Sequence, residues 1–199
     1  MLDMTETNEL KLRRAQGEDA ERVAQLFERA DVPCFCQYYQ FDGDHRQWQD
    51  RCANHRSSNR QALEQDLTDN KVSAIIALLD EQVIGWARVA RKAELRKLYD
   101  NRLYRSLAVL GEGEASTTFS ISCFLVDPKL RRHGVARALL TACVELAKTL
   151  GASAIEAFPR GATEVSDGEQ WTGPESLYQQ ANFRLIHDFP PYPVYRLNF

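Results

Sequence analysis

Residues 119–150 read FSISCFLVDPKLRRHGVARALLTACVELAKTL. The first part, Phe119–Val126, is rich in β-branched and aromatic residues, which favours a buried strand. Pro128 ends that strand because its nitrogen has no hydrogen to donate to a neighbour. Apolar residues then recur at helical spacing over Val135–Leu150, and Gly151 stands where a helix commonly stops. The predicted order is strand, short basic turn, helix.

The turn between this strand and this helix, Arg131–Ala136, has the composition of an anion site. The first N–H groups of a helix have no partner within the helix, and together with the helix dipole they favour a phosphate. Gly134 allows close approach of the backbone, and Arg131, Arg132 and His133 add positive charge. The turn is neither a P-loop nor a GxGxxG turn. Spacing alone leaves open a pyrophosphate site or an ordinary turn with solvated arginines.

This segment resembles the signature of the GNAT superfamily of N-acetyltransferases, in which a strand is followed by Arg/Gln-x-x-Gly-x-Gly/Ala and a helix. The resemblance implies an α/β fold of the α+β type, with helices on both faces of a mixed central sheet of about six to seven strands that splay at the cofactor site. It also implies acetyl-CoA as co-substrate. The pyrophosphate would be held by Arg131, Arg132, His133, Gly134, Val135 and Ala136, and the pantetheine arm by the backbone of Cys123, Phe124, Leu125 and Val126.

A second motif near the C-terminus supports the same resemblance. Residues 177–183, LYQQANF, resemble the superfamily's closing Leu-Tyr-x-x-x-Gly-Phe motif, with Asn182 in place of glycine. Asparagine is tolerated there because it also enters left-handed backbone conformations. By this resemblance, Tyr178 protonates the departing CoA thiolate. Its alternatives are core packing with a hydrogen-bonded hydroxyl, or holding the sulfur in place.

Two places in the sequence offer a general base. Residues 152–158, ASAIEAF, read as the strand after the cofactor helix, and Glu156 is a carboxylate within it. Burial raises the pKa of a carboxyl group, which makes Glu156 a candidate catalytic base. A salt-bridged or edge-facing glutamate is the alternative interpretation. His187 and Asp188 form a second candidate pair.

The stretch 31–46, DVPCFCQYYQFDGDHR, crowds cysteines and aromatic residues without a regular period. Cys34, Cys36, Cys52 and His55 have soft ligand atoms enough for zinc, but their spacing differs from the standard pairs. The alternatives are a buried aromatic cluster and the wall of an acceptor pocket, a place that this segment takes in acetyltransferases. We expect pocket wall and core, and no metal. The Cys-aromatic-Cys-x-Tyr arrangement also resembles a bacterial subgroup of these acetyltransferases.

Periodicity and turn residues predict the remaining elements. The basic run 91–105 either steers an anion or is one solvated helix face. A long polar connection over 160–173 ends near Trp171 and suggests a loop over the acceptor site. The other expected elements are strands over 10–15, 72–79, 83–89, 184–187 and 194–199, helices over 18–29 and 174–181, and a helical region over 44–69 broken near Ser57–Asn59, with Asn59 capping its second half.

Composition bounds the class of protein. The chain has 199 residues, a net charge of -3, 44% hydrophobic and 27% charged residues, which predicts a single domain over 9–199 behind a frayed end, 1–8. The acidic start is neither a signal nor a transit peptide, and no apolar run approaches the roughly 20 residues of a membrane span. Five cysteines indicate a reducing, cytoplasmic setting, and mild acidity argues against a nucleic-acid partner.

These features together predict an N-acetyltransferase that moves an acetyl group from acetyl-CoA to a primary amine of a small molecule or peptide. A non-catalytic acyl-CoA-binding regulatory module on the same scaffold is the alternative. A zinc-dependent binding domain is the third reading. The scaffold is compatible with a homodimer, which the sequence does not establish, and the expected partners include no membrane.

Overall fold

The computed structural model describes residues 9–111, 115–161 and 171–199. Within them the chain forms one seven-stranded sheet of order β1-β2-β3-β4-β5-β7-β6. Neighbouring strands are antiparallel except for β4 and β5, which are parallel, so the sheet is mixed as expected. The strands are β1 (Lys11–Arg14), β2 (Ser73–Leu79), β3 (Gln82–Arg91), β4 (Thr118–Val126), β5 (Ala154–Ala157), β6 (Arg184–His187) and β7 (Val194–Asn198).

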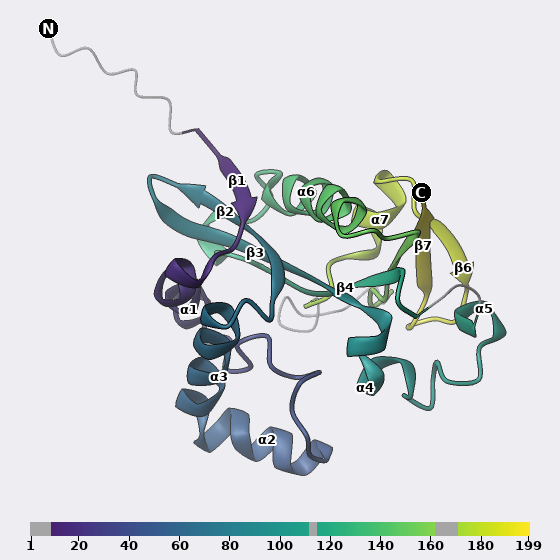
Figure 1. The fold of residues 1–199 in the computed structure, drawn as a ribbon, viewed down its shortest axis with the longest axis horizontal. Helices are drawn as coiled ribbons and strands as arrows, with labels where there is room; N and C mark the ends of the chain where they lie inside the picture. Colours follow the sequence, from purple (N-terminus) through teal and green to yellow (C-terminus); the bar gives the residue numbers. More distant parts are fainter. Residues whose placement is uncertain (1–8, 112–114, 162–170) are drawn as a thin grey trace, which may run out of the picture.

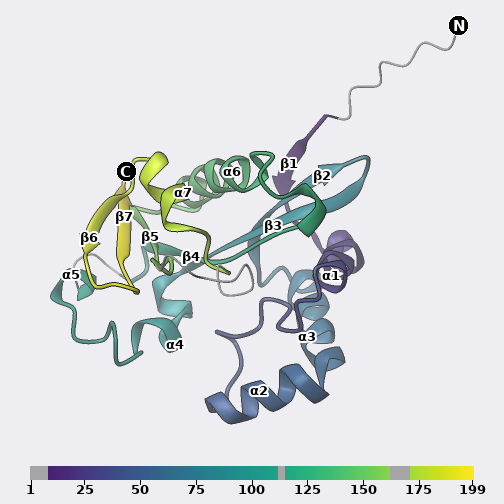
Figure 2. The ribbon, with the colours of Figure 1, turned by 180° about the vertical axis from the view of Figure 1, so that it is seen from behind.

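Helices cover both faces of this sheet, with α6 and α7 on one side and α1, α2 and α3 on the other (Figure 1). Figure 2 shows the same layers from behind. Short 3₁₀ turns lie at Gly17–Asp19, Lys92–Glu94 and Pro128–Leu130. The helices are α1 (Ala20–Arg29), α2 (His45–Asn54), α3 (Arg56–Thr68), α4 (Arg96–Tyr99), α5 (Ala108–Gly111), α6 (Val135–Thr149) and α7 (Glu175–Gln180).

The period-two alternation of the strands places two of the three hydrophobic clusters of the described residues on opposite faces of the sheet. On β2, Ile75 and Ala77 pack with the α6 side, whereas Ala74, Ile76 and Leu78 pack with the α1 and α3 side. Successive side chains of a strand point to opposite faces, so an apolar strand with little polar interruption is buried on both. This is why β2, β3 and β4 read as nearly continuous apolar runs.

Gly85 of β3 lets the start of α6 lie close against the sheet. A Cβ built at Gly85 would stand 3.0 Å from side-chain atoms of Val135 and Leu139 and 3.1 Å from Ala77. The neighbouring β2–β3 register shifts between Ala77 and Leu78, which marks a bulge. The absent side chain therefore positions the first turn of α6, and with it the basic turn that precedes the helix.

The strands β4 and β5 separate soon after they pair. They share register only over Thr118–Ser120, while β4 continues to Val126. Against β3, Cys123 is opposite Arg88 and Ile121 is opposite Val89, so Ser122 is an extra, bulged residue. Beyond that bulge, one edge of β4 has no strand beside it in the described chain. The splay that the GNAT resemblance implies is present.

Two expected elements differ from the structure. The helical region 44–69 breaks at His55, and Asn59 lies inside α3. Asn59 is fully buried and bonds to the carbonyl of Pro33 and the guanidinium of Arg51, which fixes it as a core polar residue rather than a cap. The basic run 91–105 is a 3₁₀ turn, the short α4 and further turns, not one helix.

Some expectations fall outside the described residues: the frayed end 1–8, residues 112–114 of the turn before β4, and 162–170 of the polar connection. Among the described helices, none is long and apolar enough to span a bilayer. All five cysteines are thiols, and none forms a disulfide.

Candidate functional site

The larger cavity, called here the turn cavity, has a volume of about 540 Å³ and lies where β4 leaves β5. It is lined by the end of β4, the basic turn, the first turn of α6 and, from the later part of the chain, Gly173, Pro174, Ser176, Leu177 and Gln180. It brings together eight of the ten residues expected to hold acetyl-CoA: Phe124, Leu125, Val126, Arg131, Arg132, Gly134, Val135 and Ala136.

The basic turn has a backbone suited to an anion. Gly134 precedes α6 with a φ of 81°, and nothing stands within 4 Å of a Cβ built on it. Arg132 also has a positive φ, of 66°. The first intrahelical bond runs from Ala138 to Gly134, so the N–H groups of Val135–Arg137 have no acceptor one turn earlier. These donors open toward a cavity with two arginines on its wall, which fits a diphosphate.

The turn is tied to the opposite layer of the fold. Asp127 lies directly after β4. Its side chain accepts a hydrogen bond from Lys129 N–H and forms an ion pair with Arg29, whose Nε lies 3.1 Å from a carboxylate oxygen. Arg29 also bonds the carbonyl of Val83 at 2.5 Å. Arg29 is the last residue of α1. It therefore anchors the end of β4 from the α1 face of the sheet, whereas the basic turn lies on the α6 face.

Two of the expected cofactor residues, Cys123 and His133, are not on the wall of the turn cavity. The Cys123 side chain is buried in the cluster on the α1 side of the sheet, because alternation along β4 turns it away from Phe124. His133 is exposed, and its Nδ1 lies 2.7 Å from the carbonyl of Arg131.

Tyr178 is fully buried next to the turn cavity, behind the lining residues Gly173 and Leu177, and is not itself on the cavity wall. Its hydroxyl donates to the main-chain carbonyl of Thr172. Burial raises the pKa of Tyr178 well above its usual value, so the phenol stays protonated at neutral pH. A Cβ built on Gly173 would come within 3.1 Å of this hydroxyl, and Gly173 lines the cavity. A glycine thus stands between the cavity and the phenolic proton.

Glu156 is fully buried in β5, but its carboxylate is not free. One oxygen accepts from Arg196 Nε at 3.0 Å and Nη2 at 2.5 Å, and the other accepts from the hydroxyl of Tyr99. Arg196 is the cross-strand partner of Glu156 on β7. This arrangement agrees with the interpretation of Glu156 as a salt-bridged residue. Glu156 lines neither the turn cavity nor the second cavity described below.

The second candidate base pair, His187 and Asp188, also lies apart from both cavities. The His187 ring stacks on Phe189 with centroids 5.9 Å apart. Asp188 is exposed at the end of β6.

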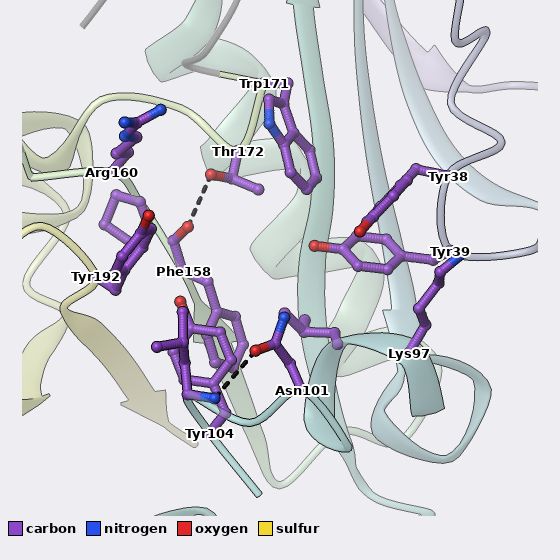
Figure 3. Close-up of a pocket in the computed structure, with 13 residues that line it drawn as sticks. Tyr38, Tyr39, Lys97, Asn101, Tyr104, Phe158, Arg160, Trp171, Thr172 and Tyr192 are labelled. Atoms are coloured by element: carbon purple, nitrogen blue, oxygen red, sulfur yellow. Dashed lines mark hydrogen bonds between the residues drawn. The ribbon is translucent and has the colours of Figure 1, made fainter. Parts of the chain in front are cut away.

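A second cavity of about 270 Å³, called here the aromatic pocket, lies on the other side of residues 171–173 (Figure 3). Tyr38 and Tyr39 approach it from the loop after α1, and their hydroxyls point into it. The aromatic residues on its wall are Tyr38, Tyr39, Tyr104, Phe158, Trp171 and Tyr192. The expectation that the segment after the first helix forms a pocket wall and an aromatic cluster agrees with this placement.

Residues 171–173 form a partition between the two cavities. Phe124 N–H, on the open edge of β4, donates to the carbonyl of Trp171 at 2.7 Å. The hydroxyl of Thr172 donates to the carbonyl of Phe158 at 2.8 Å, and its own carbonyl accepts from Tyr178. Trp171 and Thr172 line the aromatic pocket, whereas Gly173 lines the turn cavity.

The four residues considered for zinc are not arranged as a metal site. Among the described residues, no group of three or more His, Cys, Asp and Glu side chains is placed to hold an ion. Cys52 contacts Asn59, and His55 Nε2 lies 3.7 Å from an oxygen of Asp50. Cys36 is hydrogen-bonded with Cys123 across the core.

The buried Cys36 lies beside a buried arginine. Arg88 is only 5% exposed and donates to the carbonyl of Cys36 at 3.3 Å and to Gln40 at 3.0 Å. Burial acts to raise the pKa of Cys36, but the bond from Cys123 and the charge of Arg88 outweigh it and lower that pKa. The Cys123 pKa is raised by the same bond and by burial. Cys36 and Arg88 therefore stabilise each other in the core on the α1 side of the sheet.

Comparison with known proteins agrees with the fold. The sequence profile of the Acetyltransferase (GNAT) family matches residues 25–166. The match covers most of the chain, so the protein belongs to the GNAT acetyltransferase family, whose members use acyl-CoA. No curated protein matches the sequence.

Solved structures share the fold over nearly the whole chain. The PaiA N-acetyltransferase of Thermoplasma acidophilum, solved in complex with coenzyme A, is 11% identical with a TM-score of 0.58, over 96% of this chain and 99% of that one. An N-acetyltransferase from Staphylococcus aureus is 18% identical with a TM-score of 0.56, over 96% and 98% of the two chains. At these identities the likeness establishes the fold alone.

Sequence reasoning missed several residues that the structure places at the cavities. Asn101 and Tyr104 belong to the basic run, whose pattern indicates only its charges, and both line the aromatic pocket. Tyr192 lies in the proline-rich connection before β7 and reaches the same pocket. Gly173 ends the polar connection 160–173, and nothing in that pattern distinguishes it from the other glycines there. A positive φ, here 84°, is a signal that sequence does not display.

Proposed function

We propose that the protein is an N-acetyltransferase that moves an acetyl group from acetyl-CoA to a primary amine of a small molecule or peptide. The observation that carries this proposal is the turn cavity, where an open strand edge meets a basic, glycine-containing helix start. An open edge offers hydrogen bonds to an amide-bearing arm, and the helix start offers them to a diphosphate. A pantetheine diphosphate presents both groups in this order.

For donor binding, Arg131, Arg132 and the N–H groups at Gly134–Ala136 would hold the diphosphate, and the backbone of Cys123–Val126 the arm. Phe124 N–H faces the open edge, because it bonds Trp171 and not β3. Asp127 N–H bonds Ile84 on β3. Strand alternation then places Val126 N–H on the open side together with Phe124 N–H. Val126 is the donor we assign to the thioester carbonyl.

For the chemistry, the free amine of the acceptor attacks the thioester carbon, and the thiolate leaves. We assign the proton for that thiolate to Tyr178, whose raised pKa keeps the phenol protonated. The hydroxyl would exchange its bond to Thr172 for one to the sulfur, through the space that Gly173 leaves. Holding the two substrates together supplies most of the rate gain.

The acceptor would occupy the aromatic pocket, which shares the partition at Trp171–Gly173 with the turn cavity. Glu156 remains our candidate for the base, acting through Tyr99, which bridges it to Ser120 and packs on Phe158 of the aromatic pocket. Its ion pair with Arg196 competes with that role.

The alternative is an acyl-CoA-binding regulatory module without catalysis. The pairing of Glu156 with Arg196 and of Tyr178 with Thr172 favours it, because both candidate catalytic groups are engaged within the protein. It predicts acetyl-CoA binding with no CoA release for any amine tested.

Two variants test the proposal when CoA release and acetyl-CoA affinity are measured on the same preparations. Arg132→Ala should weaken acetyl-CoA binding about tenfold, because a charge-assisted bond to phosphate is lost. Tyr178→Phe should leave binding within a factor of about two and slow CoA release by about 10²-fold or more. If neither change alters binding or turnover, the proposal fails; if binding responds and no amine is acetylated, the regulatory module is the better account.

A further inference from the structure

The aromatic pocket is rich in hydrogen-bond donors and positive charge. Asn101, Lys97 and Arg160 are on its wall together with four tyrosines, and no acidic side chain is present among the described lining residues. Burial raises the pKa of Tyr39 well above its usual value and that of Tyr104 to about 12, so both remain neutral donors. A ligand that matches this wall presents acceptor atoms or negative charge.

Asn101 has a defined orientation in this wall. Its Oδ1 accepts the backbone N–H of Leu103 at 3.0 Å. That bond requires the oxygen on the Leu103 side, so the amide nitrogen, which carries two donors, is on the other side. Figure 3 shows this nitrogen turned into the pocket, toward the hydroxyl of Tyr39. The side chain therefore presents its N–H groups to a bound ligand.

The segment that carries Asn101 is locally basic in an acidic protein. Residues 96–105 contain Arg96, Lys97, Arg102 and Arg105 against the single acid Asp100, whereas the chain as a whole has a charge of -3. Arg102 and Arg105 are exposed on either side of the lining residues Leu103 and Tyr104. Charges of one sign around a cleft attract the opposite charge to it.

Lys97 and Arg160 extend this positive character to two sides of the pocket. Lys97 Nζ bonds the carbonyls of Phe41 and Gly43 and lies 4.8 Å from the ring centroid of Tyr38. Its charge thus stands directly behind the Tyr38 wall. Arg160 lies on the opposite rim, beside Thr172 and Tyr192 (Figure 3).

The remaining walls are flat aromatic faces. The Tyr38 and Tyr39 rings both contact Trp171, at centroid distances of 6.0 and 5.5 Å. Tyr104 packs edge-on against Phe158 at 4.9 Å. Aromatic faces and edges favour another flat ring. The volume of about 270 Å³ is just below the usual range of roughly 300–1,000 Å³ for ligand pockets, which indicates a small molecule.

From this combination we infer that the aromatic pocket takes a small amine bearing both a carboxylate and a flat apolar group, as an aromatic α-amino acid does. The inference rests on the proposed function, in which this pocket holds the acceptor. The carboxylate bonds the amide N–H groups of Asn101 on the basic side, the flat group lies among the aromatic rings, and the amine points to the partition at Trp171–Gly173. Polyamines, which carry several positive charges, are excluded by the same wall.

Matched ligands that differ only in the carboxylate test the inference. CoA release is measured on the full chain with L-phenylalanine against phenethylamine, with L-tryptophan against tryptamine, and with spermidine. We expect kcat/KM for each amino acid to exceed that of its decarboxylated analogue about tenfold or more, since a charge-assisted bond is lost in the analogue. Equal or better use of phenethylamine, tryptamine or spermidine would overturn the inference.

A charge substitution at Asn101 sharpens the test. Asn101→Asp keeps the oxygen that accepts from Leu103 but replaces the donors in the pocket with a negative charge, so the preference for L-phenylalanine over phenethylamine should fall below one. Gln61→Glu makes the same amide-to-carboxylate change at an exposed position of α3 and should keep it. An unchanged preference in Asn101→Asp refutes the role of this side chain.

Direct calorimetry separates failure of this inference from failure of the proposed function. L-phenylalanine and phenethylamine are titrated into the protein with and without acetyl-CoA. Tighter binding of L-phenylalanine, lost in Asn101→Asp, supports the inference even if no acetyl group is transferred. Binding of acetyl-CoA without any binding of L-phenylalanine at millimolar concentration contradicts the inference and leaves the donor site of the proposed function intact.

Discussion

The backbone N–H of Phe124 donates to the carbonyl of Trp171 at 2.7 Å. Phe124 is on the edge of β4 that β5 has left, so this bond joins the partition between the two cavities to the strand that would hold the thioester. In the proposed function, the reacting ends of both substrates would meet at residues 171–173. The contact also explains why a chain segment so far along the sequence belongs to the site.

Gly173→Ala should block the turn cavity at Tyr178. The new Cβ would stand 3.1 Å from the tyrosine hydroxyl and 3.2 Å from the ring of Phe124, at a φ of 84°. We expect CoA release to fall about tenfold or more beyond any loss of stability. Gly151→Ala is the matched control, because Gly151 has the same φ and nothing within 4 Å of its built Cβ. Both variants should lose about 1–2 kcal/mol of stability from the left-handed backbone. Equal turnover in the two would refute the blocking role.

Glu156→Gln separates a structural from a catalytic role for this residue. Replacing the carboxylate with an amide removes the ion pair between Glu156 and Arg196, whose side chains are 0% and 10% exposed. If the pair is structural, the free energy of unfolding should drop by about 3–5 kcal/mol. Urea denaturation measures this drop, and CoA release below the transition reports on the base. A loss of turnover by 10²-fold with stability unchanged would instead identify Glu156 as the base.

Asp19→Asn should destabilise the protein in a pH-dependent way. Burial acts to raise the pKa of Asp19, but bonds from Arg13 and the Gln16 N–H and the charges of Arg13 and Arg22 outweigh it, so the pKa is lowered on folding. A depressed pKa contributes stability that is present above the unfolded value of about 3.9 and is lost as pH falls. The variant should be less stable by about 1–3 kcal/mol at pH 7, and the gap should close below about pH 4. A gap that is constant with pH would exclude this account.

Gly85→Val should disturb the turn cavity by displacing α6, which packs against Gly85. A Cβ at position 85 alone would stand 3.0 Å from side-chain atoms of Val135 and Leu139. The larger valine side chain would clash with them, so α6 must move. Overpacking of this kind costs about 1–3 kcal/mol, and we expect weaker acetyl-CoA binding with it. Gly111→Val, at a position with nothing within 4 Å of the built Cβ, should change neither quantity. Normal acetyl-CoA affinity in Gly85→Val would show that the approach of α6 does not set the turn.

The sequence predicted the parts of this protein that depend on local pattern. Local residue patterns determine the strand Phe119–Val126, the basic turn and the helix that follows. The boundaries of the strand and the helix in the structure lie within two residues of the predicted ones. The same holds for Asn182, whose φ is 60° as the closing motif requires.

What the sequence could not predict depends on partners distant in the chain. Glu156 is paired with Arg196 because β7 inserts between β5 and β6, an order that no local pattern encodes. The helix break at His55 escaped prediction because the buried bonds of Asn59 to Pro33 and Arg51 override its preference for a cap. The aromatic pocket joins five separate segments, and only the fold brings them together.

The central claim is that the turn at Gly134 binds the diphosphate of the acetyl donor. Calorimetry with two ligands tests it most directly: acetyl-CoA, and S-acetylpantetheine, which has the same thioester arm without the diphosphate. The wild-type protein should bind acetyl-CoA at least about tenfold more tightly, and Gly134→Val, which strains the backbone at a φ of 81° and fills the space in front of it, should remove that difference. Equal affinities in the wild type, or a difference that persists in Gly134→Val, would contradict the claim.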